Sequence, residues 1–192
     1  MALAPSGYPQ RTETMKMLSI MTDRLMLRPQ TLADYDVWFS VYSDPEIFKV
    51  VNAPGFTAEE AWNRLLRNVG HWTSFGYGIF SVFSKEEGQF LGETGLAHFR
   101  RGVDPDFDQH VEASWVIKRS AQGQGIATEA ARAAHQWFVE AYKPSQTVCL
   151  ISKNNAASIR VANHIGYEIT QACLYKGTEC LKLACSWPRS TG

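Results

Sequence analysis

The chain has 192 residues, of which 45% are hydrophobic and 20% are charged, a composition typical of one soluble globular domain built around a single core. Lysine and arginine together number 19, as do aspartate and glutamate, so the formal net charge is zero. A general nucleic-acid-binding protein would carry a basic excess, and no apolar run is long enough to cross a membrane. The four cysteines form no Cys-x-x-Cys pair and each lies in a strand-like stretch, so we expect structural thiols in a reduced, cytoplasmic protein.

The N-terminal segment lacks the continuous apolar core of a secretory signal peptide, and we interpret residues 1–21 as a flexible extension. Organised sequence begins at residue 22. No later segment resembles a linker or an internal repeat, so residues 22–192 are predicted to form one domain.

The first half of this domain alternates between strand-like and helical patterns. Residues 22–29 alternate apolar and charged side chains and end at a proline, which predicts a strand. Apolar residues spaced three and four apart after Leu32 predict a helix, and Thr57 with Glu60 forms a capping box that opens a second helix. Further strands are predicted at residues 77–84 and 90–99, joined by a hairpin turn, and at residues 111–117 after a polar loop at residues 100–110.

The second half continues with two helices and three strands. One helix is predicted from Ile126 to Lys143, and another after Asn154 or Asn155, closed by Gly166. The strands are predicted at residues 147–152, 167–175 and 178–187. The order β-α-α-β-β-β-α-β-α-β-β mixes hairpins with helical crossovers, which indicates a mixed sheet in one α/β domain.

Two glycines stand between the strand at residues 111–117 and the helix that begins at Ile126. A P-loop would need a lysine after the second glycine, and a dinucleotide-binding turn would need a third glycine where Thr128 stands. A turn whose backbone N–H groups bind a pyrophosphate at a helix start fits better, because Gly123 and Gly125 remove the side chains that would block an anion. Ala127 keeps the helix start small. On spacing alone, a plain chain reversal stays an open alternative.

Three segments resemble one known family. Gln122-x-x-Gly125-x-Ala127 is similar to the Q/R-x-x-G-x-G/A motif with which the GNAT N-acetyltransferases bind the pyrophosphate of acetyl-CoA. The segments TDRLMLRP, EASWVIKRSAQGQGIATEA and NNAASIRVANHIGYE resemble, in that order, parts of the branch that contains the ribosomal-protein N-terminal (alanine/serine) acetyltransferases. The resemblance covers residues 22 to about 187.

This resemblance implies a single-domain GNAT-like α/β (α+β) fold. The sheet would be mixed, mostly antiparallel and seven-stranded, with a central splayed parallel pair and helices on both faces. Acetyl-CoA would be the cosubstrate, its pantetheine arm lying in the gap between the strands at residues 111–117 and 147–152. A main-chain N–H near Val116 would stabilise the oxyanion. The cofactor-binding residues implied are Val116, Ile117, Gln122, Gly123, Gln124, Gly125, Ile126, Ala127, Thr128, Asn155 and Ser158.

The resemblance also implies a general base, because an alkylamine is mostly protonated at neutral pH. Glu112 is the candidate, since related enzymes place a glutamate on this strand; an ordinary ion pair is the alternative. The weaker candidates are Glu93, His98 and His110. Many family members carry a tyrosine as general acid where this chain has Ala162, so Ser158 is the second catalytic candidate and the acid is otherwise unassigned.

The implied partners are acetyl-CoA and a primary amine, either a protein N-terminus or a small molecule, bound by a monomer or homodimer. We expect the acceptor to contact Trp38, Phe48, the loop at residues 100–110 and the final hairpin. The aspartates of that loop lack the closing glycine and glutamate of a calcium loop, so no metal is predicted. Two other functions stay open: a non-catalytic acyl-CoA sensor, which Ala162 favours, and a structural or partner-binding domain, against which the intact glycines argue.

Overall fold

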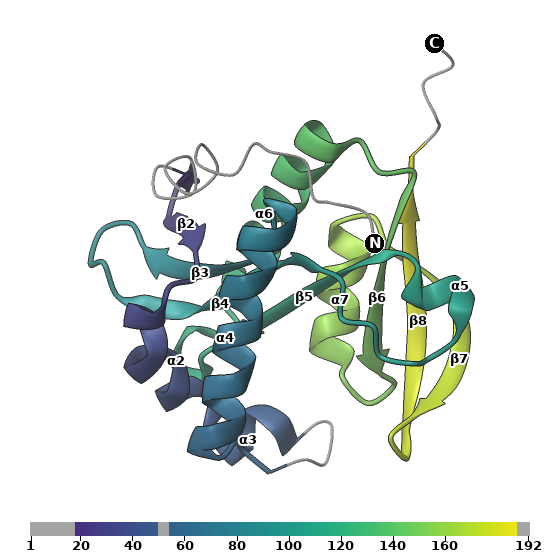
Figure 1. Ribbon diagram of the computed structural model, residues 1–192, viewed down its shortest axis with the longest axis horizontal. Coiled ribbons are helices and arrows are strands. Elements are labelled where there is room, and N and C mark those ends of the chain that lie inside the picture. Colours follow the sequence, from purple (N-terminus) through teal and green to yellow (C-terminus); the bar gives the residue numbers. More distant parts are fainter. Residues whose placement is uncertain (1–17, 50–53, 188–192) are drawn as a thin grey trace, which may run out of the picture.

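The sheet runs across the whole molecule in the order β1-β2-β3-β4-β5-β6-β8-β7 (Figure 1). The computed structural model describes residues 18–49 and 54–187. All neighbouring strands are antiparallel except the central pair β5 and β6, which is parallel. The strands are β1 (Ile20–Met21), β2 (Leu25–Pro29), β3 (Ile79–Ser84), β4 (Phe90–Ala97), β5 (Val111–Ile117), β6 (Gln146–Ser152), β7 (Glu168–Tyr175) and β8 (Thr178–Ser186).

The structure confirms the predicted fold class and adds one strand to the seven expected. The extra strand is β1, in which Ile20 pairs with Leu27 and Met21 pairs with Met26 of β2. Two residues are too few to show an alternating pattern, so this strand could not be predicted from the sequence. They lie within residues 1–21, which we interpreted as a flexible extension. The boundary between extension and domain stays a prediction, and residues 1–17 lie outside the described residues.

The helices begin and end at residues whose types are typical of helix caps. Thr57 and Glu60 form the expected capping box, and Gly76 ends the same helix in the left-handed conformation at φ 77°. Asn155, rather than Asn154, caps the last helix. A short helix also interrupts the loop predicted at residues 100–110. The helices are η1 (Leu32–Asp34), α2 (Tyr35–Tyr42), α3 (Pro45–Phe48), α4 (Ala58–Phe75), α5 (Pro105–Asp108), η3 (Arg119–Ala121), α6 (Ile126–Tyr142) and α7 (Ala156–His164).

Two hydrophobic cores lie on opposite faces of the sheet, because successive strand residues point to opposite sides. Leu25 and Leu27 of β2 pack in one core with Ala130 and Phe138 of α6. The intervening residue Met26 packs in the other core, which α2 and α4 cover. We call the second side the α2/α4 face.

The parallel strands β5 and β6 pair only where they begin. Val111 lies opposite Thr147 and Glu112 opposite Val148, and no further pair follows. Figure 1 shows the two strands starting side by side and then diverging. This is the splayed pair that the sequence led us to expect, and it leaves the later part of β5 without a neighbouring strand on that side.

Candidate active site

The turn before α6 has the conformation of an anion-binding turn. Gly123 and Gly125 have φ angles of 76° and 78°, a left-handed region that side-chain-bearing residues rarely adopt. A Cβ added at Gly123 would meet no atom within 4 Å, so the main chain here is open. Gly125 is the N-cap of α6, a helix of 17 residues whose first N–H groups have no partner within the helix. The helix dipole adds favourable potential for an anion at this end.

Polar side chains fix the turn from both sides. The Gln122 amide donates to the carbonyl of Ile117 at 2.9 Å and holds the turn against the end of β5. Arg24 of the segment before β2 donates to the carbonyl of Gln124 at 3.0 Å and forms an ion pair with Glu129 of α6 at 2.6 Å. Our sequence analysis did not assign Arg24 and Glu129 to the site.

A cavity of about 860 Å³ opens beside the turn. Three cationic side chains and the acidic side chains of the β3–β4 turn line it. The cations are Arg24, Lys85 and Lys118, and the acids include Glu86 and Glu87.

The gap between β5 and β6 is bordered by the residues expected to contact a pantetheine arm. Val116 and Ile117 pair with Glu93 and Gly92 of β4, and no residue of β6 pairs with them. Across the gap, the side-chain oxygen Oδ1 of Asn155 accepts the main-chain N–H of Ser158 at 3.0 Å as the cap of α7. The amide nitrogen of Asn155 makes no hydrogen bond within the described residues.

Glu112 lies at the point where β5 and β6 separate, and its side chain is buried in an ion pair. The Arg101 guanidinium contacts its two carboxylate oxygens at 2.9 and 2.7 Å. Burial raises the pKa of Glu112, while Arg101 opposes that rise. Glu112 therefore forms the ion pair that was the alternative prediction for it. A carboxylate with a raised pKa is also a better proton acceptor.

A second buried carboxylate, Glu93, lies on the same face four residues along the neighbouring strand. Glu93 is 1% exposed. It accepts hydrogen bonds from Gln30 at 2.7 Å and Trp38 at 2.6 Å, and it also bonds to Tyr42 and to Arg64. These bonds use both carboxylate oxygens, so Glu93 joins β4 to α2 and α4.

The burial of three side chains decides whether they lie in the site or in the core. Trp38 is fully buried and bound to Glu93, so the expectation that it contacts the acceptor is wrong. Ala162 is fully buried in the α6 and α7 core and provides no hydroxyl. Tyr167 is also buried, bonded to Thr147 and His135, and lies in the core.

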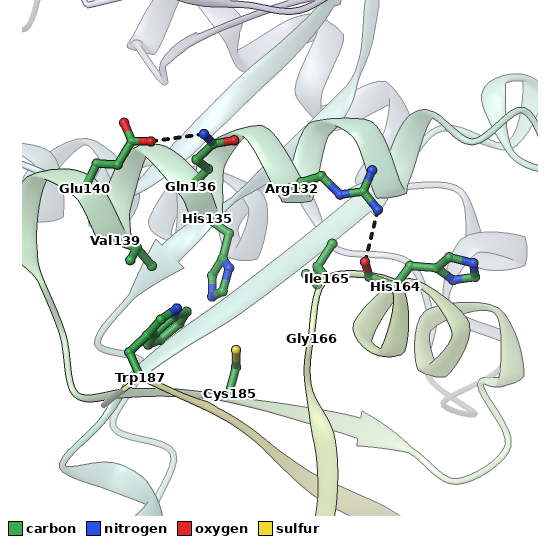
Figure 2. Close-up of a pocket in the computed structure, with 10 residues that line it drawn as sticks. All are labelled: Arg132, His135, Gln136, Val139, Glu140, His164, Ile165, Gly166, Cys185 and Trp187. Atoms are coloured by element: carbon green, nitrogen blue, oxygen red, sulfur yellow. Dashed lines mark hydrogen bonds between the residues drawn. The ribbon is translucent and has the colours of Figure 1, made fainter. Parts of the chain in front are cut away.

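A further cavity, of about 560 Å³, lies at the C-terminal half of α6, away from the turn. Figure 2 shows His135, Cys185 and Trp187 pointing toward it from α6 and the end of β8. Its distance along α6 from Gly125 separates it from the candidate active site. Burial lowers the pKa of His135 to about 4.

Residues 24–168 match the family model of the acetyltransferase (GNAT) domain. The chain belongs to the GNAT family. Among curated relatives of this GNAT protein is an uncharacterized N-acetyltransferase, p20, of Bacillus licheniformis, 24% identical over 153 residues that cover 79% of this chain and 83% of the relative.

Solved GNAT structures share the whole fold. A chain from Bordetella pertussis assigned to the GNAT acetyltransferases has a TM-score of 0.79 and 30% identity, covering 88% of this chain and 99% of that one. An acetyltransferase of Agrobacterium tumefaciens has a TM-score of 0.75 and 26% identity, covering 89% and 95%. A ribosomal L7/L12 α-N-protein acetyltransferase in complex with coenzyme A shares the fold at a TM-score of 0.70 and 16% identity, covering 88% and 98%.

The described part of this GNAT protein shows no candidate membrane span and no candidate metal site. No helix within residues 18–49 and 54–187 is long and apolar enough to span a membrane. No group of three or more histidine, cysteine, aspartate or glutamate side chains in the same residues is arranged to hold a metal ion.

Proposed function

We propose that this GNAT protein is an N-acetyltransferase that transfers the acetyl group of acetyl-CoA to a primary amine, of a protein N-terminus or a small molecule, by direct attack in a ternary complex. The observation that carries the proposal is the open, left-handed glycine turn at the start of α6, next to the gap between β5 and β6. A pyrophosphate requires accessible main-chain N–H groups at such a turn. An extended pantetheine arm requires unpaired main-chain groups along the edge of a strand.

The cofactor contacts follow from this placement. The backbone N–H groups from Gly123 to Thr128 would bind the pyrophosphate, with the main chain of Gln124, Ile126 and Ala127 between them. Main chain at Val116 and Ile117 would bind the pantetheine arm. The amide nitrogen of Asn155 would donate to a pantetheine carbonyl, since its oxygen caps α7.

The reaction needs one proton acceptor and one proton donor. The amine nitrogen bonds to the thioester carbonyl carbon, the carbon–sulfur bond breaks, and coenzyme A leaves as the thiolate. We assign to Glu112 the role of accepting the amine proton, directly or through water, because its carboxylate lies at the separation point of β5 and β6. A main-chain N–H near Val116 would stabilise the oxyanion. Ser158, one turn into α7, is the side chain proposed to protonate the thiolate.

The buried Ala162 favours one other function, a non-catalytic acyl-CoA sensor. In such a protein the turn would still bind the cofactor while transfer would be absent. The two functions differ only in whether product forms.

Amine-dependent release of coenzyme A thiol tests the proposal. The protein, acetyl-CoA and a panel of α-amino acids, alkylamines and short peptides are incubated together, and the acetylated product is identified by mass. We expect turnover with at least one amine and a loss of at least tenfold in kcat for Glu112→Gln. Binding of acetyl-CoA without release above the buffer rate for any amine would favour the sensor instead.

The proposed location is the cytoplasm, as a monomer or homodimer. The four described cysteines are free thiols, which fits a reducing compartment, and acetyl-CoA is an intracellular metabolite.

A further inference from the structure

Three arginines lie on the α2/α4 face. Two of them lie beside the ring of Phe99, and the third, Arg64, lies 4.9 Å from the centre of the Tyr42 ring. Arg64 and Arg67 are three residues apart on α4 and therefore lie on the same side of that helix. The guanidinium carbon of Arg67 lies 5.6 Å from the centre of the Phe99 ring, and that of Arg101 lies 4.8 Å from it. Arg101 also lies 5.7 Å from the ring centre of Tyr175 on β7. We call Arg64, Arg67 and Arg101 the arginine triad.

Only two members of the triad have a carboxylate partner. Arg64 pairs with the buried Glu93 at 3.1 Å, and Arg101 pairs with the buried Glu112 at 2.7 Å. Within the described residues, Arg67 makes no ion pair and no hydrogen bond, only its contact with Phe99.

Two further features indicate that the triad is incomplete by itself. The Nε of Arg64 is buried and has no hydrogen-bond partner in the described part of the chain. The side chain of Arg67 is exposed at the surface, and its pKa is lowered by partial desolvation of its guanidinium and by the positive charges of Arg64 and Arg101. An unpaired buried donor and three mutually repelling guanidiniums are both relieved by a bound anion.

The arginine triad lies next to the gap between β5 and β6, where the acceptor would meet the acetyl group in the proposed mechanism. Arg101 contacts Glu112, at the point where β5 leaves β6, and Arg64 contacts Glu93, which pairs with Val116. A ligand whose anionic end contacts Arg67 would thus extend along β4 and β5 toward the gap. The carboxylates of Glu93 and Glu112 already balance two guanidiniums, so one positive charge is left for a singly charged anion, and a doubly charged phosphate would be repelled by both carboxylates.

We propose that the arginine triad binds a carboxylate of the acceptor, so that the acceptor is an amine that also carries a carboxylate, such as an amino acid or a short peptide. The inference rests on the proposed transferase function and names the substrate class of the same site. Arg67 would donate the charge-assisted hydrogen bond to this carboxylate, since none of the described residues accepts one from it, and Phe99 and Tyr175 would provide apolar contact beside it.

Matched pairs of amines test this assignment. The value of kcat/KM is measured for α-amino acids and glycyl dipeptides and for their carboxamides, which keep the amine and side chain but lose the charge. Because the amine of a carboxamide is the less basic of the two, amine reactivity alone favours the carboxamides at neutral pH. We expect at least one acid to exceed its own carboxamide tenfold in kcat/KM, and Arg67→Gln to lower kcat/KM for that acid at least tenfold more than for its carboxamide. Arg132→Gln, an exposed arginine on α6, is the matched control and should change neither rate.

Calorimetry keeps the triad testable whether or not product forms. The same acids are titrated into wild-type protein saturated with coenzyme A. Binding of an acid that Arg67→Gln weakens tenfold supports the triad. Equal rates for acids and carboxamides, an equal loss of both in Arg67→Gln, or no binding of any acid overturns it. The proposed function fails by a different result, the absence of acetyl-CoA binding or of transfer to any amine.

Discussion

The backbone conformation of Gly125 decides whether the turn before α6 can bind an anion. Alanine at φ 78° costs about 1–2 kcal/mol and adds a methyl group at the turn. We expect Gly125→Ala to weaken acetyl-CoA binding at least tenfold by calorimetry. Gly177 in the β7–β8 turn has the same φ of 78° and open space around it, so Gly177→Ala carries the strain alone and should bind acetyl-CoA normally. Equal affinity of both variants would contradict the assignment of the turn.

His135 is expected to make stability depend on pH. Burial lowers its pKa in the folded protein to about 4, against about 6.5 when unfolded. The unfolded chain therefore binds a proton first as pH falls below 6.5, and stability present at pH 7 is lost toward pH 4. Linkage with these values gives a loss of about 2 kcal/mol between pH 7 and pH 5.

Urea unfolding of wild type and His135→Gln at both pH values measures this loss. The variant should lose less stability than the wild type by about that amount, because the other groups titrate alike in the two proteins. An identical pH dependence would show that the pKa of His135 is the same in the folded and unfolded protein, which would contradict the lowering by burial.

At the scale of elements, Glu93 attaches α2 and α4 to β4. Its removal leaves the indole N–H of Trp38 and the guanidinium of Arg64 without their buried acceptor. We expect Glu93→Ala to lower the unfolding free energy by about 3 kcal/mol or more. Glu179 pairs with Lys153 in water, at side-chain exposures of 73% and 58%, so Glu179→Ala should cost within about 0.5 kcal/mol. Similar urea midpoints for the two variants would contradict this role of Glu93.

The elements that could be predicted are those whose pattern is local. β2 has the alternating residues of a half-buried strand, α4 has its capping box, and the glycines before α6 mark a left-handed turn. β1 could not be predicted, since its two residues form a strand only because β2 lies beside them.

The contacts of the site between residues far apart in the sequence could not be predicted either. Arg24 and Glu129 are 105 residues apart, and Arg67 reaches Phe99 only after α4 packs on the sheet. Trp38 was misassigned for the same reason: an aromatic residue on an amphipathic helix gives no sign that a buried carboxylate will accept its N–H. Folding brings these residues together, and no spacing in the sequence records the contact.

At the scale of the whole molecule, the two faces of the sheet have different tasks. Buried polar groups on the α6 and α7 side, such as His135 and Tyr167, bond to each other and complete a core. Those on the α2/α4 face, Glu93 and Glu112, each pair with an arginine next to the splayed strands. The proposed cofactor gap and the proposed acceptor surface therefore meet on one face, as direct transfer in a ternary complex would require.

Calorimetric titration of the wild-type protein with acetyl-CoA tests the central claim most directly, because every other part of the mechanism depends on that site. We expect one molecule bound per chain with a micromolar dissociation constant, and competition by free coenzyme A. The absence of detectable heat and of competition at about millimolar acetyl-CoA would contradict the proposed transferase and leave only the fold and the family. Such a result would mean that the free energy of binding is weaker than about −4 kcal/mol.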